Sequence, residues 1–185
     1  MRRTRSRNAT IAAAFRRLGQ GGIAAVRAEV VARDLGVSKG SFYWHFRNLP
    51  DLKSRMLAHW QAEATDRIVA MAETGATPRE RLGRLVDLAT SDLDAPYGGY
   101  ATEAAIRDWA RSDPVAGAAQ AAADAARLAY LRQLLAQAAA PDPARAARLV
   151  LMAYTGAVHL GTADGAQLAA DLRALVMALA APSSA

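Results

Sequence analysis

The chain has 185 residues, of which 52% are apolar and 22% charged, and its formal net charge at pH 7 is +6. The absence of cysteine excludes disulfides, zinc–thiolate sites and thiol catalysis, and no apolar run of about 20 residues is available to span a membrane. With no signal peptide recognisable, a cytoplasmic protein is expected, and its alanine-rich composition favours helix throughout.

The N-terminal segment is basic and leads into a first helix. Residues 1–7 are rich in arginine and are expected to form an arm that contacts DNA phosphates or a minor groove, or else a solubilising tail. Ile11, Phe15 and Leu18 recur at helical spacing and predict the buried face of the helix. The glycines between residues 19 and 22 predict its end.

Residues 30–46, VVARDLGVSKGSFYWHF, predict a helix, a tight turn and a second, short helix. Gly36 stands where a helix C-terminus needs a left-handed residue. Ser38 is a good N-cap for the helix that follows. Phe42 and Phe46, four residues apart, can anchor that helix inward. Its other side chains then face outward, as in helices that enter the major groove of DNA.

The side chains left facing outward have chemistry that suits DNA. Lys39 can reach guanine or a phosphate, and Ser41 can bond to several bases. Tyr43 and His45 can donate to phosphate oxygens. The first 59 residues carry 12 Arg and Lys against 3 Asp and Glu, whereas the rest carry 11 against 14. This asymmetry indicates a polyanionic partner at the N-terminal end.

The run GVSKGSFYWHF, preceded by Val31-Ala32 and followed by Leu52, resembles the helix-turn-helix signature of the tetracycline-repressor (TetR) family. The resemblance covers about residues 9–57. Two positions that usually help the family to hold phosphate are occupied here by Arg27 and Leu49, and nearby basic side chains can replace those contacts. The predicted DNA-binding residues are Arg27, Ser38, Lys39, Gly40, Ser41, Tyr43, Trp44, His45, Arg47 and Lys53.

The resemblance implies an all-α, dimeric protein with two domains. Residues 1–49 would form a three-helix, helix-turn-helix head. Residues 50–185 would form a helical bundle of about five to six helices for ligand binding and dimerisation. From the pattern itself, Asn48 and Pro50 predict the start of a long helix that ends near residue 73. In the family, this helix transmits ligand binding to the head.

Five further helices are predicted, at about residues 78–93, 101–111, 114–139, 143–160 and 167–179. The last two present alanine- and leucine-rich stripes, and the resemblance favours a four-helix contact between two subunits. The alternative is a stripe buried within one subunit. The predicted interface residues are Leu149, Ala153, Ala157, Leu168, Leu172, Leu175 and Leu179.

A ligand pocket is expected among the helices after the head, with the irregular residues 92–100 at its lip. Aromatic and apolar side chains with a few polar groups would form its wall. The alternative is that these aromatics only fill a core. The predicted ligand-binding residues are Trp60, Met71, Tyr97, Tyr100, Ile106, Arg107 and Trp109.

Catalytic and metal-binding patterns are not found in the sequence. There is no phosphate-binding glycine loop or HExxH, and the three histidines lie in separate elements without metal-ligand spacing. We therefore expect no enzyme activity, no cofactor and no metal. The leading hypothesis is a repressor that binds a palindromic double-stranded operator as a homodimer and is released by a small-molecule effector of unknown identity. The alternatives are a helical small-molecule-binding or scaffolding protein without specific DNA binding, and a helical enzyme.

Overall fold

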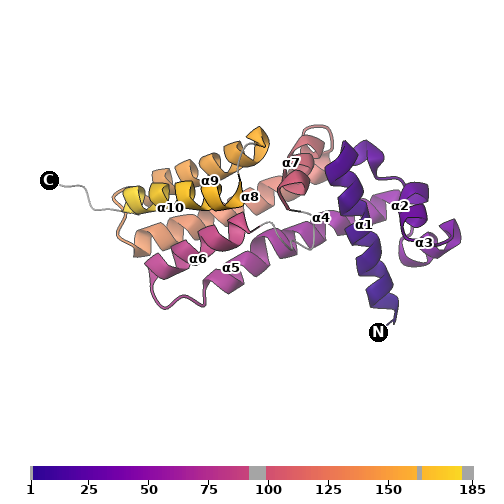
Figure 1. Cartoon of the computed structure of the whole chain (residues 1–185), viewed down its shortest axis with the longest axis horizontal. Helices are drawn as coiled ribbons and strands as arrows, with labels where there is room; N and C mark the ends of the chain where they lie inside the picture. The colour runs from indigo at the N-terminus through magenta and orange to yellow at the C-terminus, as the bar shows by residue number, and fades with distance from the viewer. Residues whose placement is uncertain (1, 92–98, 162–163, 181–185) are drawn as a thin grey trace. The chain divides into compact units, whose positions relative to one another are not determined.

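A computed structural model describes residues 2–91, 99–161 and 164–180 of the chain (Figure 1). All regular secondary structure in these ranges is helical, which confirms the predicted all-α fold. The helices are α1 (Arg2–Ala25), α2 (Ala28–Asp34), α3 (Lys39–His45), α4 (Leu49–Gln61), the π-helical η1 (Ala62–Asp66), α5 (Arg67–Ala72), α6 (Pro78–Thr90), α7 (Gly99–Ala110), α8 (Pro114–Gln137), α9 (Pro143–Leu160) and α10 (Gly165–Ala180).

By packing, the chain divides into two compact units. Unit 1 comprises the described residues within 1–63 and 93–121, and unit 2 comprises those within 64–92 and 122–185. Helices α4 and α7 thus pack with α1 to α3 in unit 1. The predicted boundary after residue 49 concerns functional domains and stays a prediction.

The first helix is longer than the sequence indicated. Residues 2–7, expected to form an arm, belong to α1, and the helix continues past Gly19. Its break comes at Gly21 and Gly22, and Gly22 has the left-handed φ of 65° that glycine adopts without steric cost. Because α1 packs along α7, tertiary contacts offset the cost of about 1 kcal/mol that a glycine brings to a helix interior.

The short α2 and α3 of unit 1 follow the predicted local rules. Gly36, with φ of 64°, ends the turn after α2. Ser38 caps α3, because its hydroxyl oxygen accepts a hydrogen bond from the backbone N–H of Ser41 at 3.2 Å. Phe42 and Phe46 are 2% and 1% exposed and anchor α3 in the core of the unit.

The long helix expected from residue 50 to about residue 73 is present but contains a π-helical turn. Asn48 caps its start by accepting from the backbone N–H of Asp51 at 2.9 Å, and Pro50 occupies its first turn. Leu52, Met56 and Trp60 are fully buried along one stripe. The segment η1 then separates α4 from α5.

Unit 2 is built from α5, α6, α9, α10 and most of α8. Helix α10 packs on both α6 and α9, which lie beside it in Figure 1. Leu82, Leu134 and Leu135 are almost completely buried in its core. Asp142 caps α9, and Gly161 closes it with a left-handed φ of 62°. None of the described helices is long and apolar enough to cross a membrane.

Candidate nucleic-acid interface and interior cavity

Helix α3 presents most of its side chains to solvent. Trp44 is 73% exposed and Tyr43 is 48% exposed, while Lys39 and Gly40 are also exposed. His45 is half-buried, as is Ser41. Neighbouring exposed aromatic side chains can mark an interaction surface. The outward face of α3 is therefore the candidate nucleic-acid interface.

Lys39, at the first turn of α3, forms an ion pair with α2. Its ammonium lies 2.6 Å from a carboxylate oxygen of Glu29, and both side chains are more than half exposed. The hydrogen bond from Lys39 holds the pKa of Glu29 below its ordinary value, and the same bond raises the pKa of Lys39. The pair fixes where Lys39 sits in the free protein.

A second ion pair, which the sequence analysis missed, joins α1 to α2. Both carboxylate oxygens of Asp34 accept hydrogen bonds from the guanidinium of Arg17. This bidentate contact keeps the pKa of Asp34 below its usual range. It positions α2, against which α3 packs.

The predicted phosphate contacts that flank α3 have different placements. Arg27 is exposed at the N-cap of α2, and Arg47 is exposed just after α3. Lys53 instead lies over the ring of Trp109, with its Nζ 5.7 Å from the ring centroid. Lys53 thus has a competing contact within unit 1.

Four of the predicted ligand-binding residues come together in unit 1, where three of them fill its core. Trp60, Ile106 and Trp109 are between 0% and 3% exposed, and Arg107 forms an ion pair with the buried Glu103 at 3.4 Å. The indole N–H of Trp60 donates to the same carboxylate at 2.8 Å.

The remaining three predicted ligand residues have different placements. Tyr100 is half-buried in α7, and Met71 belongs to unit 2 and is 41% exposed. Tyr97 lies outside the described residues. The ligand-binding role of the set stays a prediction.

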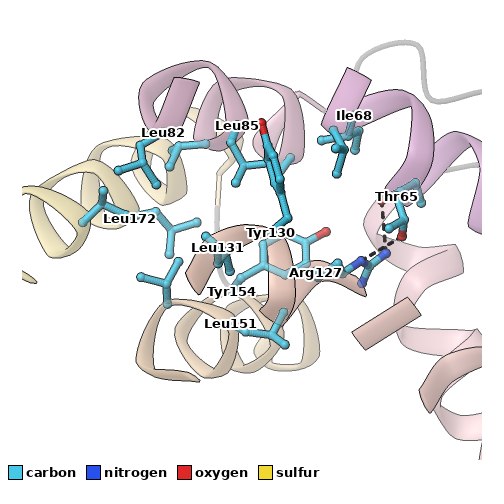
Figure 2. Close-up of a pocket in the computed structure, with 16 residues that line it drawn as sticks. Thr65, Ile68, Leu82, Leu85, Arg127, Tyr130, Leu131, Leu151, Tyr154 and Leu172 are labelled. Atoms are coloured by element: carbon cyan, nitrogen blue, oxygen red, sulfur yellow. Dashed lines mark hydrogen bonds between the residues drawn. The ribbon is translucent and has the colours of Figure 1, made fainter. Parts of the chain in front are cut away.

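A cavity of about 70 Å³ lies instead within unit 2 (Figure 2). Its wall is mostly aliphatic, and none of the described residues predicted to bind ligand contributes to it. The polar side chains in the wall are Thr65, Arg127, Tyr130 and Tyr154. The aliphatic side chains include Ile68, Leu82, Leu85, Leu131, Leu151 and Leu172.

Arg127 of α8 reaches from this wall to η1. Its Nε donates to the hydroxyl of Thr65 at 3.1 Å and one terminal nitrogen donates to the carbonyl of Ala64 at 3.2 Å, as the dashed lines in Figure 2 show. Tyr130, one turn along α8, donates its hydroxyl to Glu73 at 2.7 Å. Burial, followed by this hydrogen bond, raises the pKa of Tyr130.

One signal in the sequence could have located the cavity. Ala123, Leu131 and Leu134 of α8 are buried at helical spacing, and Arg127 stands on the same stripe. An arginine on an inward stripe needs polar partners, because burying an unpaired charge is costly. The partners themselves, from a helix about 60 residues earlier, could not be deduced from spacing.

The predicted interface residues divide between the inside and the outside of unit 2. Leu149 and Ala153 are exposed on α9, and Met152 beside them is 65% exposed. Leu168 and Leu172 are 4% and 3% exposed and pack within the unit. The interface role of the predicted set stays a prediction. The other predicted members, Ala157, Leu175 and Leu179, are half-buried.

The way in which α3 is capped, anchored and exposed defines a helix-turn-helix protein, whose short second helix is available to a DNA groove. Among the described residues, no group of three His, Asp or Glu side chains could hold a metal ion.

Comparison with known proteins gives a family match for the N-terminal part of the chain. Residues 11–52, which include α2 and α3, match the family described as bacterial regulatory proteins, tetR family. The match covers the part of the chain that contains α2 and α3, and solved structures with the same fold include TetR-family transcriptional regulators. No protein with a curated function matches the sequence.

Solved structures share the fold over nearly the whole chain. A TetR-family transcriptional regulator from Streptomyces coelicolor is 20% identical, with a TM-score of 0.78 over 96% of this chain and 88% of its own. A proposed transcriptional regulator from Saccharomonospora viridis, solved with choline, is 20% identical, with a TM-score of 0.78 over 95% of both chains. FadR from Bacillus subtilis, solved with stearoyl-CoA, is 18% identical, with a TM-score of 0.70 over 91% of this chain and 96% of its own.

Proposed function

We propose that the protein is a transcriptional repressor that binds a palindromic operator as a homodimer and is released by a small molecule. The observation that carries the DNA-binding part is the outward face of α3, where Lys39, Tyr43 and Trp44 are exposed on a helix fixed by buried phenylalanines. The excess of basic residues at this end of the chain supports the same partner.

The ligand-responsive part is supported by the cavity in unit 2. Two proteins of the same fold were solved with small molecules, choline in one and stearoyl-CoA in the other. In this chain the mostly aliphatic wall with a few polar groups is the usual composition of a small-molecule site. Release from DNA follows from linkage: a ligand that prefers the shape unable to bind DNA must weaken DNA binding. The proposal includes no catalysis and no cofactor.

The homodimer is supported by the outer face of α9. Leu149, Met152 and Ala153 are exposed there together, and an apolar face of this kind is typical of a surface that meets a partner. Two subunits related by a two-fold axis would present two α3 helices to two operator half-sites.

DNA binding is tested by fluorescence anisotropy with the full-length protein and DNA from upstream of its own gene, against unrelated DNA of equal length. Lys39→Ala should reduce discrimination between the two DNAs by about 1–3 kcal/mol, because a base contact is lost. Tyr43→Phe should weaken binding to both DNAs alike, because a phosphate contact carries no sequence information.

The alternative is a helical small-molecule-binding protein without specific DNA binding. Two features favour it: Leu49 is apolar at a position where the family usually holds phosphate, and Lys53 contacts Trp109. Equal affinity of the wild-type protein for both DNAs, unchanged in Lys39→Ala, would support this alternative and contradict the repressor.

A further inference from the structure

The wall of the cavity in unit 2 has one charged residue among the sixteen described side chains that form it. Apart from Thr65, Arg127, Tyr130 and Tyr154, the wall is aliphatic. The side chain of Arg127 is only 12% exposed. A ligand that fits this cavity should therefore be apolar over most of its surface and should place a polar end near the guanidinium of Arg127.

Arg127 donates hydrogen bonds to two neutral oxygens of η1. They are the Thr65 hydroxyl at 3.1 Å and the Ala64 carbonyl at 3.2 Å. Asp124, on the same helix as Arg127, also forms an ion pair with the guanidinium, with a carboxylate oxygen 3.8 Å from a guanidinium nitrogen. A carboxylate accepts roughly twice as strongly as a neutral oxygen, and its two oxygens match the fork of an arginine. A ligand carboxylate can therefore displace the Thr65 hydroxyl and the Ala64 carbonyl from the guanidinium of Arg127.

We propose that the cavity binds a compact apolar monocarboxylate and that Arg127 recognises its carboxylate in exchange for Thr65 and Ala64. This inference deepens the proposed function and rests on it, since it assigns the chemical class of the releasing ligand. An amine of the same shape is excluded by its like charge. An alcohol of the same shape lacks the charge that offsets further desolvation of Arg127.

The size of the cavity limits the size of the apolar part of the ligand. A cavity of about 150 Å³ is enough for benzene, and the space here is about 70 Å³. A branched acid of about five carbons has seven heavy atoms, one more than benzene, so its binding requires the leucine side chains of the wall to move apart, and a larger acid would require more of the wall to repack.

The exchange of hydrogen bonds at Arg127 allows ligand binding to affect the structure of η1 and of the helix next to it. Segment η1 follows α4 directly. It contains residues 63 and 64, between which unit 1 ends and unit 2 begins along the chain. Short π-helical turns are rare inside helices and frequent at functional sites. Loss of the Arg127 hydrogen bonds removes side-chain support from this turn, so that ligand binding alters the helix that leads to unit 1.

The experiment uses three probes with one carbon skeleton: 3-methylbutanoate, 3-methylbutan-1-ol and 3-methylbutan-1-amine. Binding to the full-length protein is measured by titration calorimetry at pH 7. We expect the carboxylate to bind at least tenfold more tightly than the alcohol, and the amine not to bind. Equal binding of carboxylate and alcohol, or no binding of the carboxylate, would overturn the proposal.

Variants assign the preference to Arg127. Arg127→Gln should abolish the advantage of the carboxylate over the alcohol, while Arg132→Gln, at an exposed position of the same helix, should keep it. Thr65→Val should tighten carboxylate binding, because the guanidinium then gives up one hydrogen bond fewer. If Arg127→Gln does not fold by circular dichroism, Arg127→Lys takes its place and should lose most of the advantage. A preference unchanged in the folded Arg127 variant would overturn the proposal.

DNA affinity separates this inference from the proposed function. 3-Methylbutanoate should weaken operator binding of the wild-type protein and leave that of Arg127→Gln unchanged. DNA binding without any carboxylate preference would overturn the ligand assignment alone. A carboxylate preference in a protein that binds no DNA would overturn the repressor function and leave the ligand class standing.

Discussion

At the scale of single residues, the ion pair between Lys39 and Glu29 controls a candidate base contact. Lys39 must leave the carboxylate of Glu29 before it can reach a base edge, and that carboxylate repels nearby phosphates. Both effects work against DNA binding. In the proposed complex with DNA, Glu29 would thus influence recognition without any contact of its own with DNA.

We expect Glu29→Gln to strengthen binding to operator and unrelated DNA by up to about fivefold, because exposed ion pairs are weak. Anisotropy titrations at several salt concentrations measure the change. Asp171→Asn, on the surface of α10, removes the same charge far along the chain and is the control. A weaker Glu29→Gln complex would show that the ion pair prepares Lys39 for DNA instead of restraining it.

At the scale of elements, the turn between α2 and α3 depends on the backbone of Gly36. Its φ is 64°, and an added Cβ would meet no neighbour, so conformation alone decides the cost of a side chain. We expect Gly36→Ala to lower the free energy of unfolding by roughly 1–2 kcal/mol in urea denaturation.

The matched control for Gly36→Ala is Gly83→Ala. Gly83 lies within α6 with ordinary helical geometry, and an added Cβ there would also meet no neighbour. This substitution should raise the free energy of unfolding by about 0.5–1 kcal/mol, because alanine loses less backbone entropy in a helix. Similar values for the two variants would show that left-handed strain does not shape the turn.

The contact between α1 and α2 should make stability depend on pH. The pKa of Asp34 is lowered by Arg17, so this carboxylate contributes stability above its unfolded pKa of about 3.9 and loses it as pH falls through the lower folded value. Asp34→Asn should therefore be less stable than the wild type near pH 7, with the difference shrinking below about pH 4. Thermal melts across this range measure it, and a difference independent of pH would assign the effect to packing.

At the scale of the whole molecule, the two faces of the last helices should respond differently to charge. Met152 is 65% exposed on α9, whereas Leu172 of α10 is 3% exposed and lines the cavity. We expect Met152→Glu to give a folded monomer with weakened operator binding, because a charge in a subunit interface is left desolvated. Analytical ultracentrifugation with circular dichroism measures both properties.

Leu172→Glu is the comparison for Met152→Glu. It should unfold unit 2, since it places a carboxylate in an aliphatic interior, where the cost is several kcal/mol. A Met152→Glu protein that remains a dimer at micromolar concentration would exclude this face of α9 as the interface.

The sequence by itself determined the elements whose signals are local. Gly36 and Ser38 predicted the turn and the cap of α3, and Asn48 with Pro50 predicted the start of α4. Each of these depends on backbone geometry within four residues, so the residue type decides the structure. The family resemblance rested on the same short stretch, and residues 11–52 are where the family match lies.

Only the tertiary structure decided which side chains face one another. The spacing of Trp60, Ile106 and Trp109 suits a pocket wall as well as a core, and packing placed them in the core of unit 1. The cavity forms where Arg127 meets Thr65, 62 residues apart in the chain. Helical periodicity indicates that a face is buried, but the partner of that face depends on how distant helices pack, and no local pattern encodes that choice.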